Sequence, residues 1–130
     1  MDKSFTTKTS ADGYIQVVEG VERKTLVYGE KTLLTEFRLT SGNHLPMHKH
    51  PHEQTGYLVS GHIVLIIDGR RHHILPGDSW IILSNVEHGA EIIKDSIAIE
   101  MFSPVREDFI PSNRKLYNNK GEWENELLRN

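Results

Sequence analysis

Short alternating segments separated by turn residues constrain the fold of this chain more than any other feature of its sequence. Turn signals recur about every eight to twelve residues between positions 14 and 102, a spacing typical of an all-β sandwich or small barrel. Within Lys31–Thr40 the residues alternate between two faces, and this period of two predicts a half-buried strand. The face predicted to be buried carries Leu33, Thr35, Phe37 and Leu39.

Two turns join neighbouring strands in this reading. Gly29-Glu30 separates the strands expected at 23–28 and 31–40, and Asp68-Gly69 is the strongest short hairpin turn in the chain. The segment 62–68 is apolar on both faces, which suits a central strand. Further strands are expected at 79–83, 90–94 and 96–102, the last two divided by Lys94-Asp95.

A length of 130 residues corresponds to one domain. We expect residues 1–13 to be loosely held, residues 14–110 to form the β-barrel and residues 111–130 to form a C-terminal tail. This segment is expected to be a short tail or a helix, and to pack either across the domain or onto a partner subunit. The helical alternative comes from the spacing of Trp123, Leu127 and Leu128.

Composition excludes several classes of function. The chain has no cysteine, so disulfide scaffolds, thiolate metal sites and cysteine nucleophiles are ruled out. A net charge of −3 argues against a general nucleic-acid binder. No apolar run approaches the roughly 20 residues of a membrane span, and the first ten residues do not read as a secretory signal. We therefore expect a cytoplasmic protein that binds neither nucleic acid nor membrane.

Histidine is abundant, with eight residues, four of them between positions 44 and 52. His48 and His50 are two residues apart, so on an extended backbone their imidazoles point the same way, and Gln54 has the same parity. Two converging imidazoles form part of a site for a borderline divalent metal, and His88 is the best third candidate. His52 is undecided, because it shares the parity of His48 and His50 but follows Pro51. No ligand role is expected for His44, His62, His72 and His73.

Two motifs resemble those of the cupin superfamily. The first cupin motif is a glycine, five residues, His-x-His, three or four residues, usually Glu, six residues and a glycine. The matching positions are Gly42, His48, His50, Gln54 and Gly61. The second motif is similar to residues 69–88, which contain Pro76-Gly77 and end at His88. The resemblance covers about residues 35–103.

This resemblance implies a small cupin-type β-barrel, a double-stranded β-helix or jelly roll, that holds one divalent metal ion (Zn, Ni, Fe or Mn). The ligands it implies are His48, His50, Gln54 and His88. Gln54 stands where the superfamily usually has Glu. A neutral amide leaves the site one negative charge short, so a bound cation keeps more Lewis acidity.

A second informative segment begins in the last expected strand and continues beyond it. Glu100 and Phe102 share a strand face with Ala98, so Glu100 is expected to face the barrel mouth or lumen, where a raised pKa would suit acid–base chemistry. Arg106, beyond a proline turn, could form a bidentate pair with a substrate carboxylate. The alternative is structural: a Glu100–Arg106 salt bridge closes the barrel, and Arg106 caps a turn of the tail.

The segment from Glu100 to Asp108 resembles the end of the pectin-degradation cupins of the KdgF type, which carry Ser-Pro-x-Arg-Glu-Asp. The resemblance implies an enzyme that opens the ring of 4,5-unsaturated uronates to the linear keto form. It implies Glu100 as acid–base group, Arg106 as substrate-carboxylate partner and Phe102 as a pocket wall. The chain departs from the family in having Glu100 where the family has Asp.

Other functions stay open at this stage. A mouth lined by aromatic and sulfur side chains would accept an aromatic ligand as readily as a sugar, which suits a dioxygenase or polyketide cyclase. The side chains expected there are Met47, Tyr57, Trp80 and Phe102. A non-catalytic module that binds a small carboxylated ligand is a further alternative. A homodimer is expected, because the strand edges of a small open barrel need protection.

Overall fold

The computed structural model describes residues 5–110, 115–117 and 123–125 of the chain. The elements in these ranges are β1 (Ile15–Val18), β2 (Val21–Tyr28), β3 (Leu33–Leu39), β4 (His44–His48), β5 (Glu53–Ile67), β6 (Arg70–Ile74), β7 (Ser79–Ile82), β8 (His88–Ser103), the 3-10 turn η1 (Glu107–Phe109), β9 (Lys115–Tyr117) and β10 (Trp123–Asn125). In the part of the chain so described, no helix has the length and hydropathy needed to cross a membrane.

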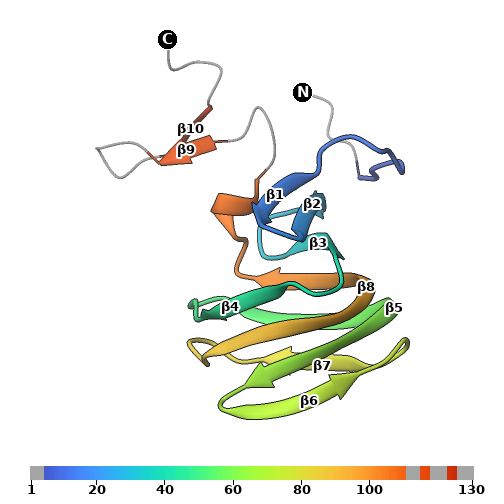
Figure 1. The fold of residues 1–130 in the computed structure, drawn as a ribbon. Helices are drawn as coiled ribbons and strands as arrows, with labels where there is room; N and C mark the ends of the chain where they lie inside the picture. The colour runs from blue at the N-terminus through green and yellow to red at the C-terminus, as the bar shows by residue number, and fades with distance from the viewer. Residues whose placement is uncertain (1–4, 111–114, 118–122, 126–130) are drawn as a thin grey trace.

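The first eight strands form one antiparallel sheet in the order β1-β2-β3-β8-β5-β6. β4 pairs with the early part of β8, and β7 pairs with the early part of β5. The sheet curls on itself, so that β1, β2 and β3 lie at one end of the stack and β6 and β7 at the other (Figure 1). The predicted all-β barrel is confirmed.

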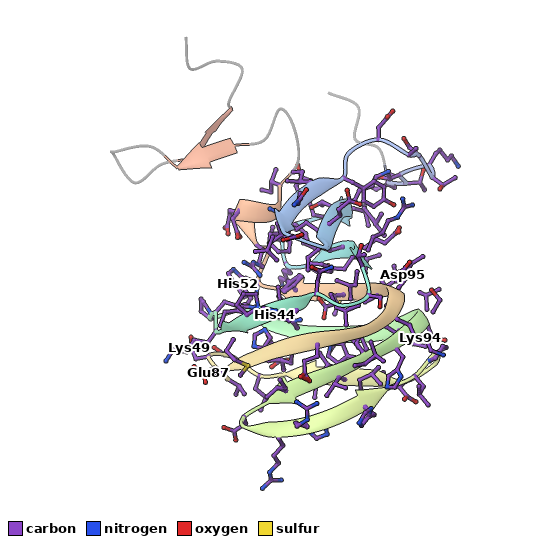
Figure 2. All side chains as sticks on the ribbon, in the orientation of Figure 1. His44, Lys49, His52, Glu87, Lys94 and Asp95 are labelled. Carbon is purple, nitrogen blue, oxygen red and sulfur yellow. The ribbon has the colours of Figure 1, made fainter. Side chains whose placement is uncertain are left out.

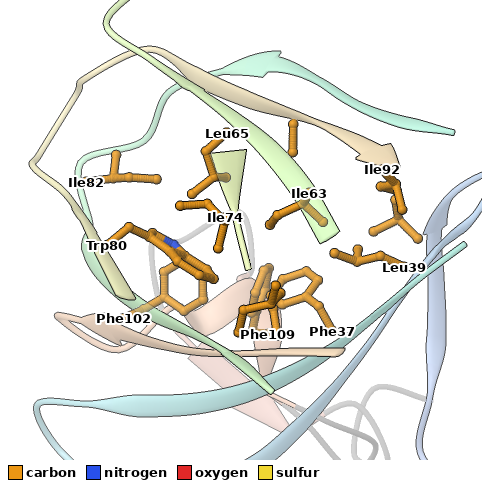
Figure 3. Packing of buried hydrophobic residues seen from close by; sticks show 14 of the residues in the cluster. Phe37, Leu39, Ile63, Leu65, Ile74, Trp80, Ile82, Ile92, Phe102 and Phe109 are labelled. Carbon is orange, nitrogen blue, oxygen red and sulfur yellow. The ribbon is translucent and has the colours of Figure 1, made fainter. Parts of the chain in front are cut away.

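The core follows from the alternation along the strands. On β3 the side chains of Leu33, Thr35, Phe37 and Leu39 are buried, whereas the intervening residues are half-buried or exposed. In Figure 3 the strands surround the buried cluster, in which the rings of Phe37, Trp80, Phe102 and Phe109 lie opposite isoleucine and leucine side chains. The predicted buried face of β3 and the central position of residues 62–67, in β5 between β6 and β8, are therefore confirmed.

β5 and β8 are the longest strands, and they bend together. Their register shifts between Leu58 and Ser60 and again between Ser60 and His62. Gly61 lies inside this irregular stretch with φ +97°, and a Cβ there would overlap the Ser96 hydroxyl and the Asp95 carbonyl. Only glycine combines this backbone conformation with so close an approach of the partner strand.

The expectation of two strands at 90–94 and 96–102 is wrong, because both belong to the continuous strand β8. Figure 2 shows Lys94 and Asp95 together at the end of the barrel away from His52 and Lys49. The Ser96 hydroxyl accepts the His62 backbone N–H at 3.0 Å and donates to the Lys94 carbonyl at 2.6 Å. These bonds replace regular ladder bonds at the bend, so the polar residues turn the strand without ending it.

After β8 the chain docks back on β2 through η1. The Thr25 hydroxyl donates to the Phe109 carbonyl, and Phe109 is buried against Phe102 and Phe37. Further on, β9 and β10 pair with each other as a separate two-stranded sheet. The short helix considered for the tail is therefore wrong at Trp123–Asn125, which forms the strand β10. Helical spacing of three apolar residues could not reveal that this segment pairs with β9. Leu127 and Leu128 lie outside the described residues.

The bend predicts a large difference between two glycine substitutions. Gly61→Ala should lower the free energy of unfolding by about 1–3 kcal/mol more than Gly69→Ala, because Gly69 also has a positive φ but has no atom within 4 Å of an added Cβ. Denaturant unfolding of both variants measures the difference. Equal losses would show that strand approach at the bend does not constrain this position.

Candidate metal centre and its cavity

Three histidine side chains meet at one site of the barrel. His48 ends β4 and His88 begins β8, and the two residues are antiparallel partners. His50 follows in the loop after β4. One ring nitrogen from each of the three lies within 4.8 Å of the others, so the group could hold a metal ion. The sequence placed His48 and His50 on one face of a single strand, but β4 ends at His48. The position of the His50 ring beside the other two is instead set by the loop that follows β4.

Each of these imidazoles is oriented by a backbone carbonyl. Nδ1 of His48 lies 2.8 Å from the Pro46 oxygen, Nδ1 of His50 lies 2.9 Å from the His52 oxygen, and Nδ1 of His88 lies 2.8 Å from the Val86 oxygen. A carbonyl oxygen only accepts, so Nδ1 carries the proton and Nε2 keeps its lone pair. Such outer hydrogen bonds fix the tautomer and direction of metal-ligating histidines.

The Nε2 atom of His88 is buried and has no hydrogen-bond partner. A buried nitrogen with an unshared lone pair is costly unless something binds it. Burial lowers the pKa of His88 to about 4, and burial together with the Arg106 charge lowers the pKa of His50. Both rings are therefore neutral near pH 7, and these donors fit a divalent cation.

Gln54 joins the histidines to the next strand. It is buried near the start of β5, and its Oε1 lies 2.9 Å from Nε2 of His50. Two ligand atoms that bind one cation at right angles, each about 2.1 Å from it, are about 3 Å apart. The distance between Nε2 of His50 and Oε1 of Gln54 would therefore also suit two ligands of one ion. The amide nitrogen of Gln54 donates to Oε1 of Glu100 at 2.7 Å. The same side chain therefore links the candidate ligands to a carboxyl group.

Glu100 lies on β8 between the buried residues Ala98 and Phe102, so its side chain faces the interior. Its Oε1 also accepts the indole N–H of Trp80 at 3.0 Å. Burial raises the pKa of Glu100 to about 7, against the lowering effect of these two hydrogen bonds. Gly56 makes the contact feasible, because any Cβ there would overlap the Trp80 ring.

A cavity of about 320 Å³ connects these groups with Arg106. The guanidinium of Arg106 is paired with Asp108, at 3.2 Å from Nε to Oδ1 and 2.9 Å from Nη2 to Oδ2. Only 17% of the Arg106 side chain is exposed, against 59% for Asp108. Among the described residues, the ion pair recorded for Arg106 is this one, and it takes the place of the Glu100–Arg106 bridge considered from the sequence.

The other sequence-predicted residues lie in different places. Phe102 lines the cavity, whereas Met47 (42% exposed) and Tyr57 (50% exposed) do not. Trp80 donates to Glu100 but is not among the lining residues either. His62 and His73 contact each other on the outer surface, 2.9 Å apart. His52 lies in the same loop as His50, and its carbonyl oxygen orients the His50 ring.

Sequence reasoning missed two residues that line the cavity, Arg23 and Asp108. The parity of β2 could have indicated Arg23, because Val21 and Thr25 on the same face are buried. The close spacing of Asp108 after Arg106 was visible, but only the 3-10 turn shows that the two side chains meet.

Comparison with known proteins agrees with this fold. A family model described as "Cupin domain" matches residues 35–103, more than half of the chain. The chain therefore belongs to the cupin domain family.

Three individual proteins are similar to this chain over most of its length. The pectin degradation protein KdgF of Dickeya dadantii is 28% identical over 94 residues, which cover 71% of this chain and 86% of that protein. The structure of KdgF from Halomonas sp. aligns with a TM-score of 0.75 at 28% identity, covering 82% of this chain and 98% of that one. An RmlC-like cupin from Shewanella frigidimarina aligns with a TM-score of 0.78 at 27% identity, covering 83% and 97%.

Metal binding should depend on His88. His88→Gln is expected to weaken the binding of one divalent ion per chain by more than about 100-fold, whereas His72→Gln, an exposed residue of β6, should not. Metal titration against a competing chelator measures both affinities. Chelation should also lower the melting temperature of the wild-type protein but not that of His88→Gln. Unchanged affinity in His88→Gln would contradict the assignment.

Proposed function

We propose that this chain is a metal-dependent cupin enzyme that acts on a small carboxylated sugar and opens the ring of a 4,5-unsaturated uronate to its linear keto form. One observation carries the proposal. Gln54 contacts both the candidate ligand His50 and the carboxyl group of Glu100, and Gln54 and Glu100 line one cavity together with Arg106. Groups suited to binding a metal, moving a proton and holding a carboxylate thus lie close together, which supports the proposal.

The proposed reaction is an isomerisation. The bond between C1 and the ring oxygen breaks, and the anomeric hydroxyl loses its proton as C1 becomes an aldehyde. The former ring oxygen is left as an enol at C5, which becomes a ketone when C4 gains a proton. One proton leaves oxygen and one arrives at carbon, so no oxidant, reductant or water is consumed.

The residues of the chain have separate roles in this proposal. His48, His50, His88 and Gln54 would hold a divalent cation, which supplies Lewis acidity to a coordinated substrate oxygen. Glu100 would receive and return the proton, since Gln54 and Trp80 hold its carboxyl group at the cavity. Arg106 would hold the uronate carboxylate, and Phe102 would form the adjoining wall.

The similarity to KdgF of Dickeya dadantii supports the choice of substrate class, because that protein is described as a pectin degradation protein. The decisive experiment is incubation of the metal-loaded protein with 4,5-unsaturated galacturonate. Ultraviolet absorbance of the conjugated double bond should fall faster than in a protein-free control. Saturable binding without product would instead identify a binding module, and oxygen uptake with Fe(II) would identify an oxygenase.

Loss of Arg106 should separate substrate binding from metal binding. Arg106→Ala is expected to raise KM by roughly 10- to 100-fold, because a charge-assisted bidentate contact is lost. Metal content should be unchanged, since Arg106 is not among the candidate ligands. Steady-state kinetics with metal analysis measures both, and an unchanged KM would rule out the carboxylate role of Arg106.

Loss of the Glu100 carboxylate should affect the chemical step. Glu100→Gln is expected to lower kcat by about 10²- to 10⁴-fold with little change in KM, because the amide cannot accept the proton. Glu100→Asp keeps a carboxylate and introduces the residue type found in the KdgF-type family, although its side chain is one methylene shorter. This variant should therefore retain more activity than Glu100→Gln. Equal kcat values for Glu100→Gln and wild type would remove Glu100 from the mechanism.

A further inference from the structure

Trp80 contacts Glu100 although it does not itself line the cavity. It lies on β7, only 9% of it is exposed, and its ring belongs to the buried cluster (Figure 3). The sequence predicted a contact between Trp80 and the ligand, but Trp80 is not among the residues that line the cavity. Its indole N–H instead donates to Oε1 of Glu100, a side chain that does line the cavity, at 3.0 Å.

A glycine on the strand between them gives the indole ring its space. Gly56 on β5 is the partner of Trp80 on one side and of Glu100 on the other, so the three residues form one row across β7, β5 and β8. A Cβ on Gly56 would overlap the Trp80 ring. Gly56 has no positive φ, so the ring rather than the backbone conformation requires glycine here. The row is therefore built around a large side chain that reaches Glu100 across β5.

The hydrogen bonds from Trp80 and Gln54 end on the same oxygen of Glu100. The indole nitrogen lies 3.0 Å and the amide nitrogen of Gln54 lies 2.7 Å from Oε1. A carboxylate oxygen has two lone-pair sites, so these two donors fill those of Oε1. A carboxyl group is planar, and holding one of its oxygens limits the direction of the other. Oε2 is the oxygen that these two bonds leave to the cavity.

Two donors from different strands hold the carboxyl group more firmly than one. A hydrogen bond to a carboxylate is charge-assisted and stronger than a bond between neutral groups. With Gln54 alone, the carboxyl group would still swing about that single bond, whereas the donor from β7 restricts this motion. The restriction matters for proton transfer, because a misplacement of about 1 Å costs about 10²-fold in rate.

We propose that Trp80 is a positioning residue: together with Gln54 it holds Oε1 of Glu100, so that Oε2 is the oxygen presented to the ligand. The inference rests on the proposed function, because it says which atom of the acid–base group meets the substrate. Trp80 thus acts through Glu100 and not by contact with the ligand. Gly56 gains a role as well, since the residue at this position must leave room for the ring.

The test removes the indole N–H and keeps the ring. Trp80 is replaced by benzothienylalanine, in which sulfur takes the place of the N–H, in a Trp123→Phe background so that a single tryptophan position is exchanged. With 4,5-unsaturated galacturonate and the metal-loaded protein, kcat is expected to fall by roughly 10- to 100-fold and KM to change by less than about twofold. A purely structural role of the ring would leave both constants unchanged, because the two rings are nearly the same in size and shape.

Two further variants control for packing. Trp123→Phe alone is the matched control, because Trp123 lies on β10, in the two-stranded sheet that is separate from the barrel sheet. Its kcat and KM should equal those of the wild type. Trp80→Phe also removes the N–H but has a smaller ring, so it should lower the melting temperature in addition to kcat, whereas the benzothienyl protein should lose only kcat.

A readout that is independent of turnover tests the contact itself. The chain has two tryptophans, so its proton–nitrogen correlation spectrum has two indole resonances, and Trp123→Phe assigns them. Glu100→Gln replaces the charge-assisted hydrogen bond by a weaker one to a neutral amide. The indole proton of Trp80 should therefore move upfield in Glu100→Gln, and that of Trp123 should stay in place.

The outcomes distinguish this inference from the proposed function. If the wild type converts the uronate and the benzothienyl protein is as fast as Trp123→Phe, or differs from it only in KM, the positioning role is wrong and the reaction stands. If the wild type converts no uronate, the proposed function fails and the indole resonance alone judges the contact. Its upfield shift in Glu100→Gln then supports the hold of Trp80 on Glu100, and an unchanged resonance overturns it.

Discussion

The antiparallel pairing of β5 with β8 is the interaction on which the rest of the structure depends. It joins two strands of fifteen and sixteen residues, and every other strand of the barrel except β1 and β2 pairs with one of them. His88 and Glu100 lie on the same strand and would be about 40 Å apart if it were straight. Both border one cavity because the bend at Gly61 and Ser96 folds β8 back.

The same pairing fixes the order of groups inside the barrel. Gln54 on β5 is the partner of Phe102 on β8, and Gly56 is the partner of Glu100 and of Trp80 on its other side. A continuous set of contacts therefore runs from His50 through Gln54 to Glu100 and Trp80. Since Oε1 of Gln54 faces Nε2 of His50 and its amide nitrogen donates to Glu100, a change in the candidate metal centre would affect the carboxyl group directly.

The segment that follows β8 in the sequence contributes part of the cavity lining, although it does not belong to the barrel strands. η1 brings Asp108 to Arg106 and Phe109 to Phe102, and its backbone is held by Thr25 and Arg23 of β2. The family match ends at residue 103, so Arg106 and Asp108 lie beyond the matched region. The barrel thus provides the candidate ligands, and the following segment provides Arg106, which we propose to hold the carboxylate of the substrate.

Much of this protein could be predicted from the sequence because the relevant signals are local. The period of two determined the buried face of β3, and Asp68-Gly69 marked a turn in which both residues have positive φ. Residue type and spacing singled out His48, His50 and His88. Only the tertiary structure decided the continuity of β8, the approach of His50 from a loop and the pairing of Arg106 with Asp108. Each depends on cross-strand register or on the docking of a turn, which join residues distant in sequence and leave no periodic pattern along it.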